Sequence, residues 1–476
     1  MTENRIFMGS ISQKEIYMGK FKDKRLDKRA SKLSALLLAG RSSSIHEIAP
    51  TEAEQKAAYR FLNNEKTEEG TLINTVKERS SYLCTGKDVL VIQDTTDFNL
   101  TNHRRRLQPN TGVGLAGGTT DDVGFFLHSS LVLDGRDETI LGFSDIQLWH
   151  REGQSTKVER GYKRLPIEQK ESFKWIKACN ESKEHLVAAT SITFIEDREG
   201  DIYEQFARIP DERTHLIIRS RDNRNLSNGA KLFDELSQQP VSGRYDIDIV
   251  KDIRKGIEKR IASVEVRFCK VNITRSAAAL KKETAGQVEL YAIEVREINE
   301  SVPNPIKWRL LTTHVVDSYQ RAIEIINNYR KRWYIEQLFR LLKKKGFDIQ
   351  SSELETGWAI RKLMVMILNA ALRVMQLLLA YDNQHCQAVE EVFDPGEIKC
   401  LQGLNKTLEG ETEKSKNKYD PGQLSWATWV IARLGGWKSY NTQRPPGPIA
   451  LKRGLDKFAS IYQGWKLALS LKKDVS

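Results

Sequence analysis

The chain is poor in cysteine, and its beginning lacks an apolar leader. The 476 residues contain 5 cysteines, scattered without a CxxC pair: Cys84, Cys179, Cys269, Cys386 and Cys400. This spacing argues against a disulfide framework and against a thiolate zinc site, so we expect a reducing compartment. No apolar segment follows a basic one among the first residues, so the sequence predicts no secretory signal.

Long apolar runs are also scarce. The most apolar helix candidate, residues 362–380, is interrupted by polar and charged side chains at Lys362, Asn369, Arg373 and Gln376. It therefore lacks an uninterrupted apolar run of membrane length. We expect a core helix in a soluble, cytoplasmic protein that has no membrane partner.

Positive charge, in contrast, is in excess. Lys and Arg number 75 against 63 Asp and Glu, which gives a formal net charge of +12 and a pI near 9.2. This balance favours a polyanionic partner such as nucleic acid. A surface that only keeps the protein in solution is the alternative.

The stretch YRKRWYIEQLFRLLK, residues 329–343, predicts one polar face of a helix. Residues 318–345 contain no Gly and no Pro, and Asp317 with Gln320 forms a capping pair, so we expect one long helix. At about 100° per residue, four polar side chains share an arc of roughly 60°: Tyr329, Arg332, Glu336 and Lys343. An exposed helix with charge pairs three and four residues apart is the alternative.

Two apolar stretches end in an aspartate. Residues 89–92 and 192–195 are predicted to be buried strands, and they are followed by Asp94 and Asp197. Each acid alone is explained as well by a turn cap, but together with Glu336 they could converge on one site. Carboxylates are ligands of hard divalent cations, and two such cations about 4 Å apart can drive phosphodiester cleavage and joining.

The remaining pattern predicts a mixed sheet flanked by helices. Three consecutive strands are expected between residues 89 and 148, with a basic, glycine-rich hairpin at 104–120 in place of a dinucleotide site. Helices are expected at 24–38, 51–64 and 167–178, and an alternating, β-rich stretch spans 241–313. Polar breakers at 394–396 and 420–422 interrupt a helical C-terminal region, whose tryptophans favour either docking or packing on the same chain.

The chain resembles the cut-and-paste enzymes of the IS-four family of DDE transposases. The signature of that family is Tyr, two residues, Arg, three residues, Glu, six residues, Lys, and it is matched by Tyr329, Arg332, Glu336 and Lys343. QDTT at Asp94 and DREGDI at Asp197 resemble its two aspartate motifs, and AYRF, KESFKW, KWRLLT and ARLGG are further similar stretches. The resemblance covers nearly the whole chain.

The resemblance implies an α/β fold in three domains. Residues 1–68 would form a helical DNA-binding domain, residues 69–382 a ribonuclease H-like catalytic domain with a β insertion at about 241–313, and residues 383–476 a helical dimerisation domain. The implied activity is cut-and-paste transposition, with a 3′ nick, hairpin formation and opening, and strand transfer into target DNA.

The same resemblance implies site residues and partners. Asp94, Asp197 and Glu336 would be the catalytic ligands of two Mg²⁺ ions, which Mn²⁺ could replace. The expected DNA contacts are Tyr329, Arg332, Lys343, Trp308, Arg219, Arg221, Arg25 and Arg29. The expected partners are double-stranded transposon ends and target DNA, bound by a homodimer in the bacterial cytoplasm at the nucleoid.

Two other functions stay open from the sequence. A non-catalytic DNA-binding regulator descended from a transposase would share these motifs, although the intact acids disfavour it. A structure-specific nuclease would cut DNA without joining donor to target. The products of a reaction with DNA and Mg²⁺ distinguish all three functions.

Overall fold

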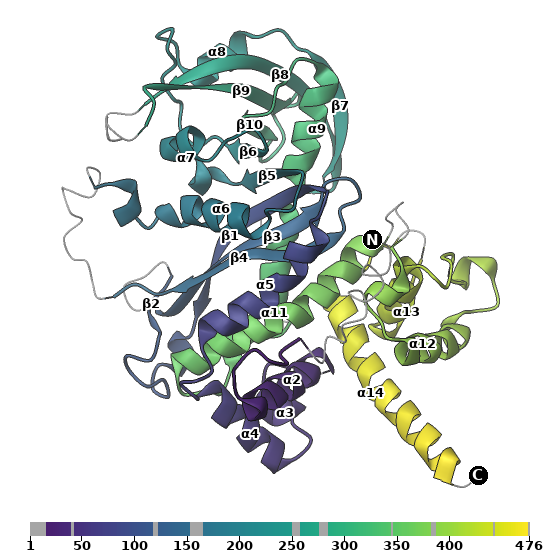
Figure 1. Cartoon of the computed structure of the whole chain (residues 1–476). Coiled ribbons are helices and arrows are strands. Elements are labelled where there is room, and N and C mark those ends of the chain that lie inside the picture. Colours follow the sequence, from purple (N-terminus) through teal and green to yellow (C-terminus); the bar gives the residue numbers. More distant parts are fainter. Residues whose placement is uncertain are drawn as a thin grey trace.

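A mixed sheet forms the centre of the computed structural model, with helices on both of its faces (Figure 1). The structure describes residues 16–39, 42–117, 122–152, 165–249, 258–275, 284–343, 346–381, 387–440 and 443–474. Within these residues the sheet has 10 strands.

The first half of the sheet has the strand order β4-β3-β1-β5-β6. The strands are β1 (Asp88–Asn99), β3 (Val123–Asp134), β4 (Ile140–Trp149), β5 (Ser191–Glu196) and β6 (Thr214–Arg219). β3 is antiparallel to β1 and β4, whereas β1, β5 and β6 run parallel. This mixed sheet flanked by helices confirms the predicted α/β class and agrees with a ribonuclease H-like fold.

The β-rich stretch extends the same sheet. β10 (Lys307–Thr312) pairs with β6, and β9 (Gln287–Glu297), β8 (Arg260–Thr274) and β7 (Gly243–Ile249) follow in that order. The predicted insertion is therefore continuous with the central sheet. Near the other edge, β2 (Gly114–Leu115) pairs with β3. The next regular element after the glycine-rich stretch is therefore the strand β3, whereas a dinucleotide site requires a helix there.

Alternate residues of β1 point to opposite faces of the sheet and take part in two cores. Leu90 and Ile92 pack in the core with α5 (Glu69–Leu83), α9 (Tyr319–Arg330), α10 (Trp333–Leu342) and α11 (Gly357–Ala380). Val89 and Val91 pack in the core with α6 (Phe173–His185), α7 (Tyr203–Arg208) and α8 (Leu232–Gln238). The 3₁₀ helices are η1 (Thr101–His103), η3 (Ile167–Gln169), η4 (Arg198–Gly200), η6 (Ile349–Ser351), η7 (Val389–Glu391) and η8 (Glu413–Ser415).

The N-terminal helices are α2 (Lys24–Ala39), α3 (Ile45–Ile48) and α4 (Glu52–Leu62), and α2 and α4 pack beside α11, at the bottom of Figure 1. Thr51 caps α4, because its hydroxyl accepts a hydrogen bond from the backbone nitrogen of Glu54 at 3.3 Å. α11 is long and apolar enough to span a membrane, yet 83% of its most apolar window is buried inside the protein. This burial agrees with the predicted core helix.

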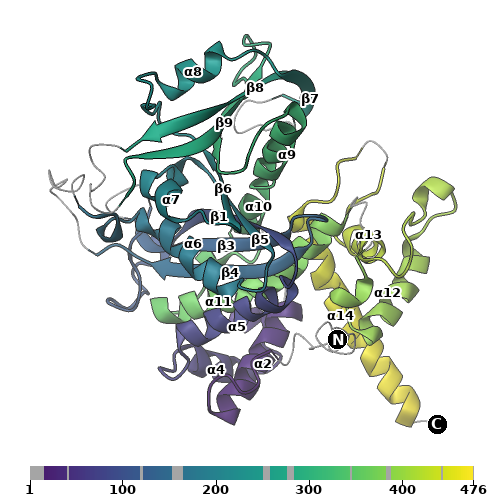
Figure 2. The same ribbon diagram turned by 45° about the horizontal axis from the view of Figure 1, so that its top comes forward.

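The C-terminal helices are α12 (Pro395–Leu408), α13 (Leu424–Leu434) and α14 (Pro448–Asp474). Asp394 was expected to break a helix and instead begins α12, since its side chain accepts from the Glu397 nitrogen at 2.8 Å. Trp426, Trp429 and Trp437 are buried within this chain. The far end of α14 projects from the body of the protein (Figure 2).

The expected single helix over 318–345 is wrong, because it is interrupted at Lys331 and Arg332. There the backbone nitrogens bond three residues back, as from Lys331 to the Asn328 oxygen at 3.1 Å and from Ile335 to the Arg332 oxygen at 3.2 Å. Ser318, not Asp317, caps α9. The helix predicted at 167–178 is also shifted, since η3 precedes an α6 that begins at Phe173.

We predict that Gly454→Ala destabilises the packing of α13 on α14. A Cβ atom at Gly454 would lie 1.9 Å from the backbone oxygen of Ile431, so the helices would have to separate. The expected loss is about 1–3 kcal/mol in the free energy of unfolding, measured with urea. Gly464→Ala on the same helix is the control, because a Cβ there meets nothing within 4 Å. Equal stability of the two variants would contradict the packing.

Candidate active site

Arg332 joins two of the predicted acids. Its Nη1 donates to Oδ2 of Asp94 at 2.9 Å, and its Nη2 donates to Oε1 of Glu336. Asp94 comes from β1 and Glu336 from the first turn of α10. The side chains of Arg332 and Asp94 are each 17% exposed, so this ion pair is partly shielded from water.

Asp197 directly follows β5, the strand that neighbours β1, and lies beside Asp94. Ile92 of β1 is level with Ile195 of β5, and each aspartate follows two residues later, on the same face of the sheet. Asp197 caps η4, since its Oδ1 accepts from the Glu199 nitrogen at 2.8 Å. Asp94, however, does not end its strand, because β1 continues beside β3 to Asn99; what ends near Asp94 is the pairing with β5.

The three carboxylates influence one another. Burial raises the pKa of Asp94 to about 7. The charge of Arg332 opposes this rise, and the negative charges of Asp197 and Glu336 add to it. Asp94 therefore lies in a cluster of like charge that a single guanidinium compensates only in part.

Tyr329, Trp308 and Arg219 gather next to Arg332. The rings of Trp308 and Tyr329 lie 6.2 Å apart at 61°, an edge-on contact. Burial raises the pKa of the Tyr329 hydroxyl, while the charges of Arg332 and Arg219 lower it. Four expected DNA contacts thus form one group: Tyr329, which is buried, with Trp308, Arg219 and Arg332 beside it.

Lys343, which directly follows α10, contacts β1 beyond Asp94. Its Nζ donates to Oδ1 of Asp97 at 3.2 Å and stands 5.8 Å from the centre of the Phe98 ring. Both cations of the predicted polar face, Arg332 and Lys343, are therefore paired with aspartates of β1.

The other expected DNA contacts are not part of this group. The exposed side chain of Arg221 pairs with the neighbouring Asp222 at 3.2 Å. Arg25 and Arg29 lie on the outer side of α2, in the N-terminal helical region, where Arg25 is exposed and Arg29 half-buried.

Comparison with known families gives two matches. Residues 8–67 match the family described as transposase DNA-binding, and residues 180–373 match the family described as transposase DDE domain. The chain carries a transposase DNA-binding domain and a DDE transposase domain. Asp197 and Glu336 lie within the DDE match, whereas Asp94 precedes it.

A solved structure is also similar, at low identity. It is the cryo-EM structure of the piggyBac transposase synaptic complex with hairpin DNA, with 9% sequence identity and a TM-score of 0.35. The match covers 75% of this chain and 66% of that chain, which is slightly less than two thirds of its length.

The acids beside the DDE domain's helix α10 have the donor chemistry of a divalent cation site. As the side chains stand, no group of three His, Cys, Asp or Glu in the described residues is arranged to hold a metal ion. Arg332 bonds to both Asp94 and Glu336 and compensates part of their negative charge. Because carboxylate oxygens suit Mg²⁺ and this cluster is short of positive charge, the residues fit such an ion once Arg332 moves away.

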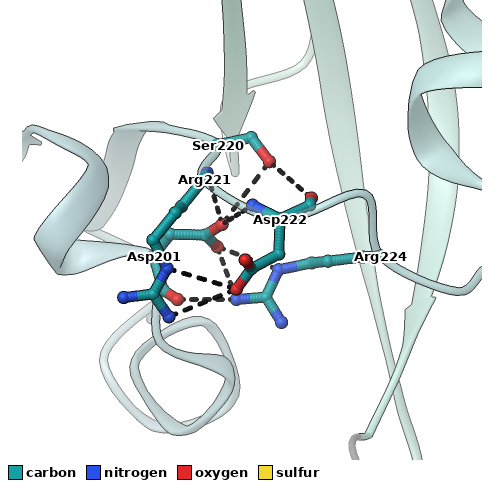
Figure 3. Close-up of polar contacts among 5 residues, drawn as sticks. All are labelled: Asp201, Ser220, Arg221, Asp222 and Arg224. Atoms are coloured by element: carbon teal, nitrogen blue, oxygen red, sulfur yellow. Dashed lines mark hydrogen bonds and ion pairs between the residues drawn. The ribbon is translucent and has the colours of Figure 1, made fainter.

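Asp201 anchors the turn after β6, a role that the sequence analysis missed (Figure 3). Its buried carboxylate accepts from the Arg221 nitrogen at 2.8 Å and from Nε of Arg224 at 2.9 Å. Because Asp201 directly follows η4, these bonds fix the segment after Asp197 against the end of β6. The second acid in the DREGD stretch is the signal that could have found it.

A buried polar network on the opposite face was also missed. Gln93 donates to the Cys179 thiol sulfur at 3.5 Å, and Cys179 and Gln205 both donate to Oε1 of Glu196. Burial raises the pKa of Glu196 well above its usual value, so this carboxyl keeps its proton. Gln93 and Glu196 directly precede Asp94 and Asp197, so the network supports both strands from behind.

We predict that Glu196→Gln changes how stability depends on pH. The unfolded chain loses the Glu196 proton near pH 4.5, whereas the folded chain keeps it to a much higher pH. Stability of the wild type therefore falls as pH rises above 4.5, by up to about 1.4 kcal/mol per unit from this group. The variant lacks this loss, so its free energy of unfolding should rise relative to that of the wild type between about pH 5 and pH 8.

Urea unfolding at several pH values measures this difference. Glu199→Gln, which removes an exposed carboxylate of η4, controls for the loss of a negative charge. Parallel pH profiles for wild type and Glu196→Gln would show that Glu196 ionises normally in the folded protein.

Proposed function

We propose that the chain is a Mg²⁺-dependent DNA transposase. It would nick DNA at transposon ends, form and open a hairpin, and join the freed 3′ ends to target DNA. The observation that carries this proposal is the meeting of Asp94 and Glu336 on Arg332, with Asp197 beside them, in a chain that has a DDE transposase domain.

The acids and cations have separate roles in this proposal. Asp94, Asp197 and Glu336 hold two Mg²⁺ ions, which Mn²⁺ can replace; when bound, such ions activate the attacking oxygen and neutralise developing charge. Arg332 and Lys343 bind phosphates of the cleaved strand, because both are positively charged and lie beside the acids of β1.

Aromatic and more distant basic residues complete the proposed DNA contacts. Trp308 is half-buried against Tyr329 and stacks on a base that leaves the duplex during hairpin formation. Tyr329 and Arg219 bind phosphate from the same group, and Arg221 binds beside it. Arg25 and Arg29 bind the transposon end from α2, within the match to a transposase DNA-binding family.

Binding of DNA then requires an exchange of partners. In the protein alone, Arg332 and Lys343 bind the acids of β1. When DNA phosphates take up these two cations, the carboxylates of Asp94 and Glu336 become available to Mg²⁺. DNA binding thus prepares the site for its metal ions, so that hydrolysis starts only on a bound end.

We propose that a homodimer binds paired transposon ends, in the bacterial cytoplasm at the nucleoid. The end of α14 supports a contact between two copies, because it projects from the body (Figure 1). It also exposes large apolar side chains. These side chains are Ile461, Leu467, Leu469 and Leu471.

Incubation with Mg²⁺, DNA that flanks the gene and a target plasmid tests the function. A transposase yields nicked ends, hairpins and joined products. Nicks without joined products would favour the structure-specific nuclease, and binding without any cleavage would favour the non-catalytic regulator.

We predict that Glu336→Gln keeps DNA binding and abolishes Mg²⁺-dependent nicking. The amide cannot replace the anionic oxygen of a metal ligand, so a loss of at least about a hundredfold is expected in the nicking rate. Gel shift measures binding, and a labelled end measures nicking. Glu324→Gln on α9 is a control, since that carboxylate is exposed and pairs with Arg321. Retained nicking in Glu336→Gln would remove Glu336 from the catalytic set.

We predict that Arg332→Ala tightens Mn²⁺ binding by the DNA-free protein. Removing the guanidinium frees two carboxylates and removes a repelling charge, so the dissociation constant should fall at least about tenfold. Electron paramagnetic resonance of free Mn²⁺ measures this without any reaction. Arg330→Ala, at the exposed end of α9, is the control. Unchanged or weaker Mn²⁺ binding would contradict the proposal that Arg332 must leave the carboxylates before a metal ion binds.

A further inference from the structure

The basic loop comprising residues 101–106 directly follows the strand that carries Asp94. β1 ends at Asn99, and the loop begins with η1 (Thr101–His103). Its residues line a hollow of about 480 Å³. The lining includes His103 and three consecutive arginines. These arginines are Arg104, Arg105 and Arg106.

The basic loop is held in place by specific bonds. The backbone nitrogen of Arg104 donates to the Thr101 oxygen at 3.1 Å, and the Thr101 hydroxyl accepts from the Val123 nitrogen at 2.9 Å. Arg106 is turned inward, where its Nη2 donates to the backbone oxygen of Ser352. The loop that lines the hollow is therefore held by bonds within the protein.

Arg104 and Arg105 differ from most arginines near the site. Arg332, Arg361 and Arg224 each pair with a carboxylate. Arg104 and Arg105 are exposed, and within the described part of the chain neither has a carboxylate partner. Adjacent cations without an acid repel one another, so a multivalent anion would relieve a standing repulsion.

The basic loop also lies between the transposase DNA-binding domain and the candidate active site. The Gln108 nitrogen bonds the Glu355 oxygen at 2.8 Å, and Thr356 next to it donates to Oδ1 of Asn63 at 2.6 Å. Asn63 belongs to the segment matched as transposase DNA-binding, which ends at residue 67. On the other side, Gln350 donates to the backbone oxygen of Asn99, at the end of β1, at 3.2 Å.

The turn after the basic loop is fixed as well. Gly112 has a φ of +88°, and a Cβ atom there would lie 2.5 Å from the ring of Trp358. Arg361 lies over that ring at 5.1 Å and donates to the Gly112 oxygen at 3.2 Å. A glycine is therefore needed at this position for the loop to stay docked on the start of α11.

We infer that the basic loop is a binding surface for the phosphate backbone of double-stranded DNA. This inference rests on the proposed function, because it places the loop on the path of a duplex that runs from the DNA-binding domain to the acids. Arg104 and Arg105 contact phosphates, and Arg106 holds the loop. Such contacts strengthen binding on any sequence and carry no base specificity.

The test is the double variant Arg104→Glu with Arg105→Glu in the full chain. A fluorescent duplex of mixed sequence is the probe, and its dissociation constant is measured over a series of salt concentrations. We expect affinity to fall at least about tenfold and the slope of log K against log salt to become shallower by about 1.8, the value for two phosphate contacts. Arg104→Gln with Arg105→Gln should give a smaller loss of affinity and the same change of slope.

Lys414→Glu with Lys416→Glu is the matched control, because it makes the same change of charge on an exposed segment elsewhere. The inference is overturned if affinity and slope stay as in the wild type, or if the control loses as much as the loop variant. Mg²⁺-dependent nicking by the wild type is followed in parallel. If the wild type nicks DNA and the loop variant binds DNA as tightly as the wild type does, the inference about the loop is rejected and the catalytic proposal stands. If the loop variant binds DNA more weakly and the wild type does not nick DNA, the catalytic proposal is rejected and the inference about the loop stands.

Discussion

The charge balance around Asp94 governs the candidate site. Asp94, Asp197 and Glu336 carry like charge and lie close enough to influence one another, and burial raises the pKa of Asp94 further. The Arg332 guanidinium makes this cluster stable in the protein alone, since it bonds two of the three carboxylates. Removing one partner from a buried ion pair commonly costs about 3–5 kcal/mol, so any replacement must itself be a cation.

The surrounding fold keeps the acids at their positions. The parallel pairing of β1 with β5 sets Asp94 level with Asp197, and α10 brings Glu336 over the same face. Behind these strands, Glu196 and its partners form a neutral polar network, so no further charge is added to the cluster. Asp201 then fixes the segment that follows Asp197 (Figure 3).

The sequence predicts the parts of this arrangement that depend on local pattern. Periodicity and β-branched residues indicate β1, β5, α2, α4 and α11, and the spacing from Tyr329 to Lys343 selects the polar face that carries Glu336. The break between α9 and α10 could not be predicted, because the 318–345 stretch favours helix throughout. The break falls at Arg332, which contacts Asp94, a residue 238 positions away in the sequence.

Long-range pairing explains the other differences. Asp94 lies inside β1 because β3, on the far side of a hairpin, continues to pair with it. Asp-Pro-Gly at 394–396 indicates an interruption of helix, and long-range context decides that a new helix begins there, because the Asp394 carboxylate caps the first turn of α12. The roles of all the expected DNA contacts stay predictions. Arg25, Arg29 and Arg221 differ from the others in that they do not meet the acid cluster in the protein alone.

The most direct test of a shared metal site is a crystal structure of the full chain with duplex DNA and Mn²⁺, with the ion located by anomalous scattering. We predict an anomalous peak between the carboxylates of Asp94, Asp197 and Glu336, with Arg332 moved from Asp94 to a DNA phosphate. A DNA-bound structure in which Arg332 still joins Asp94 to Glu336, and in which Mn²⁺ lies elsewhere, would contradict it.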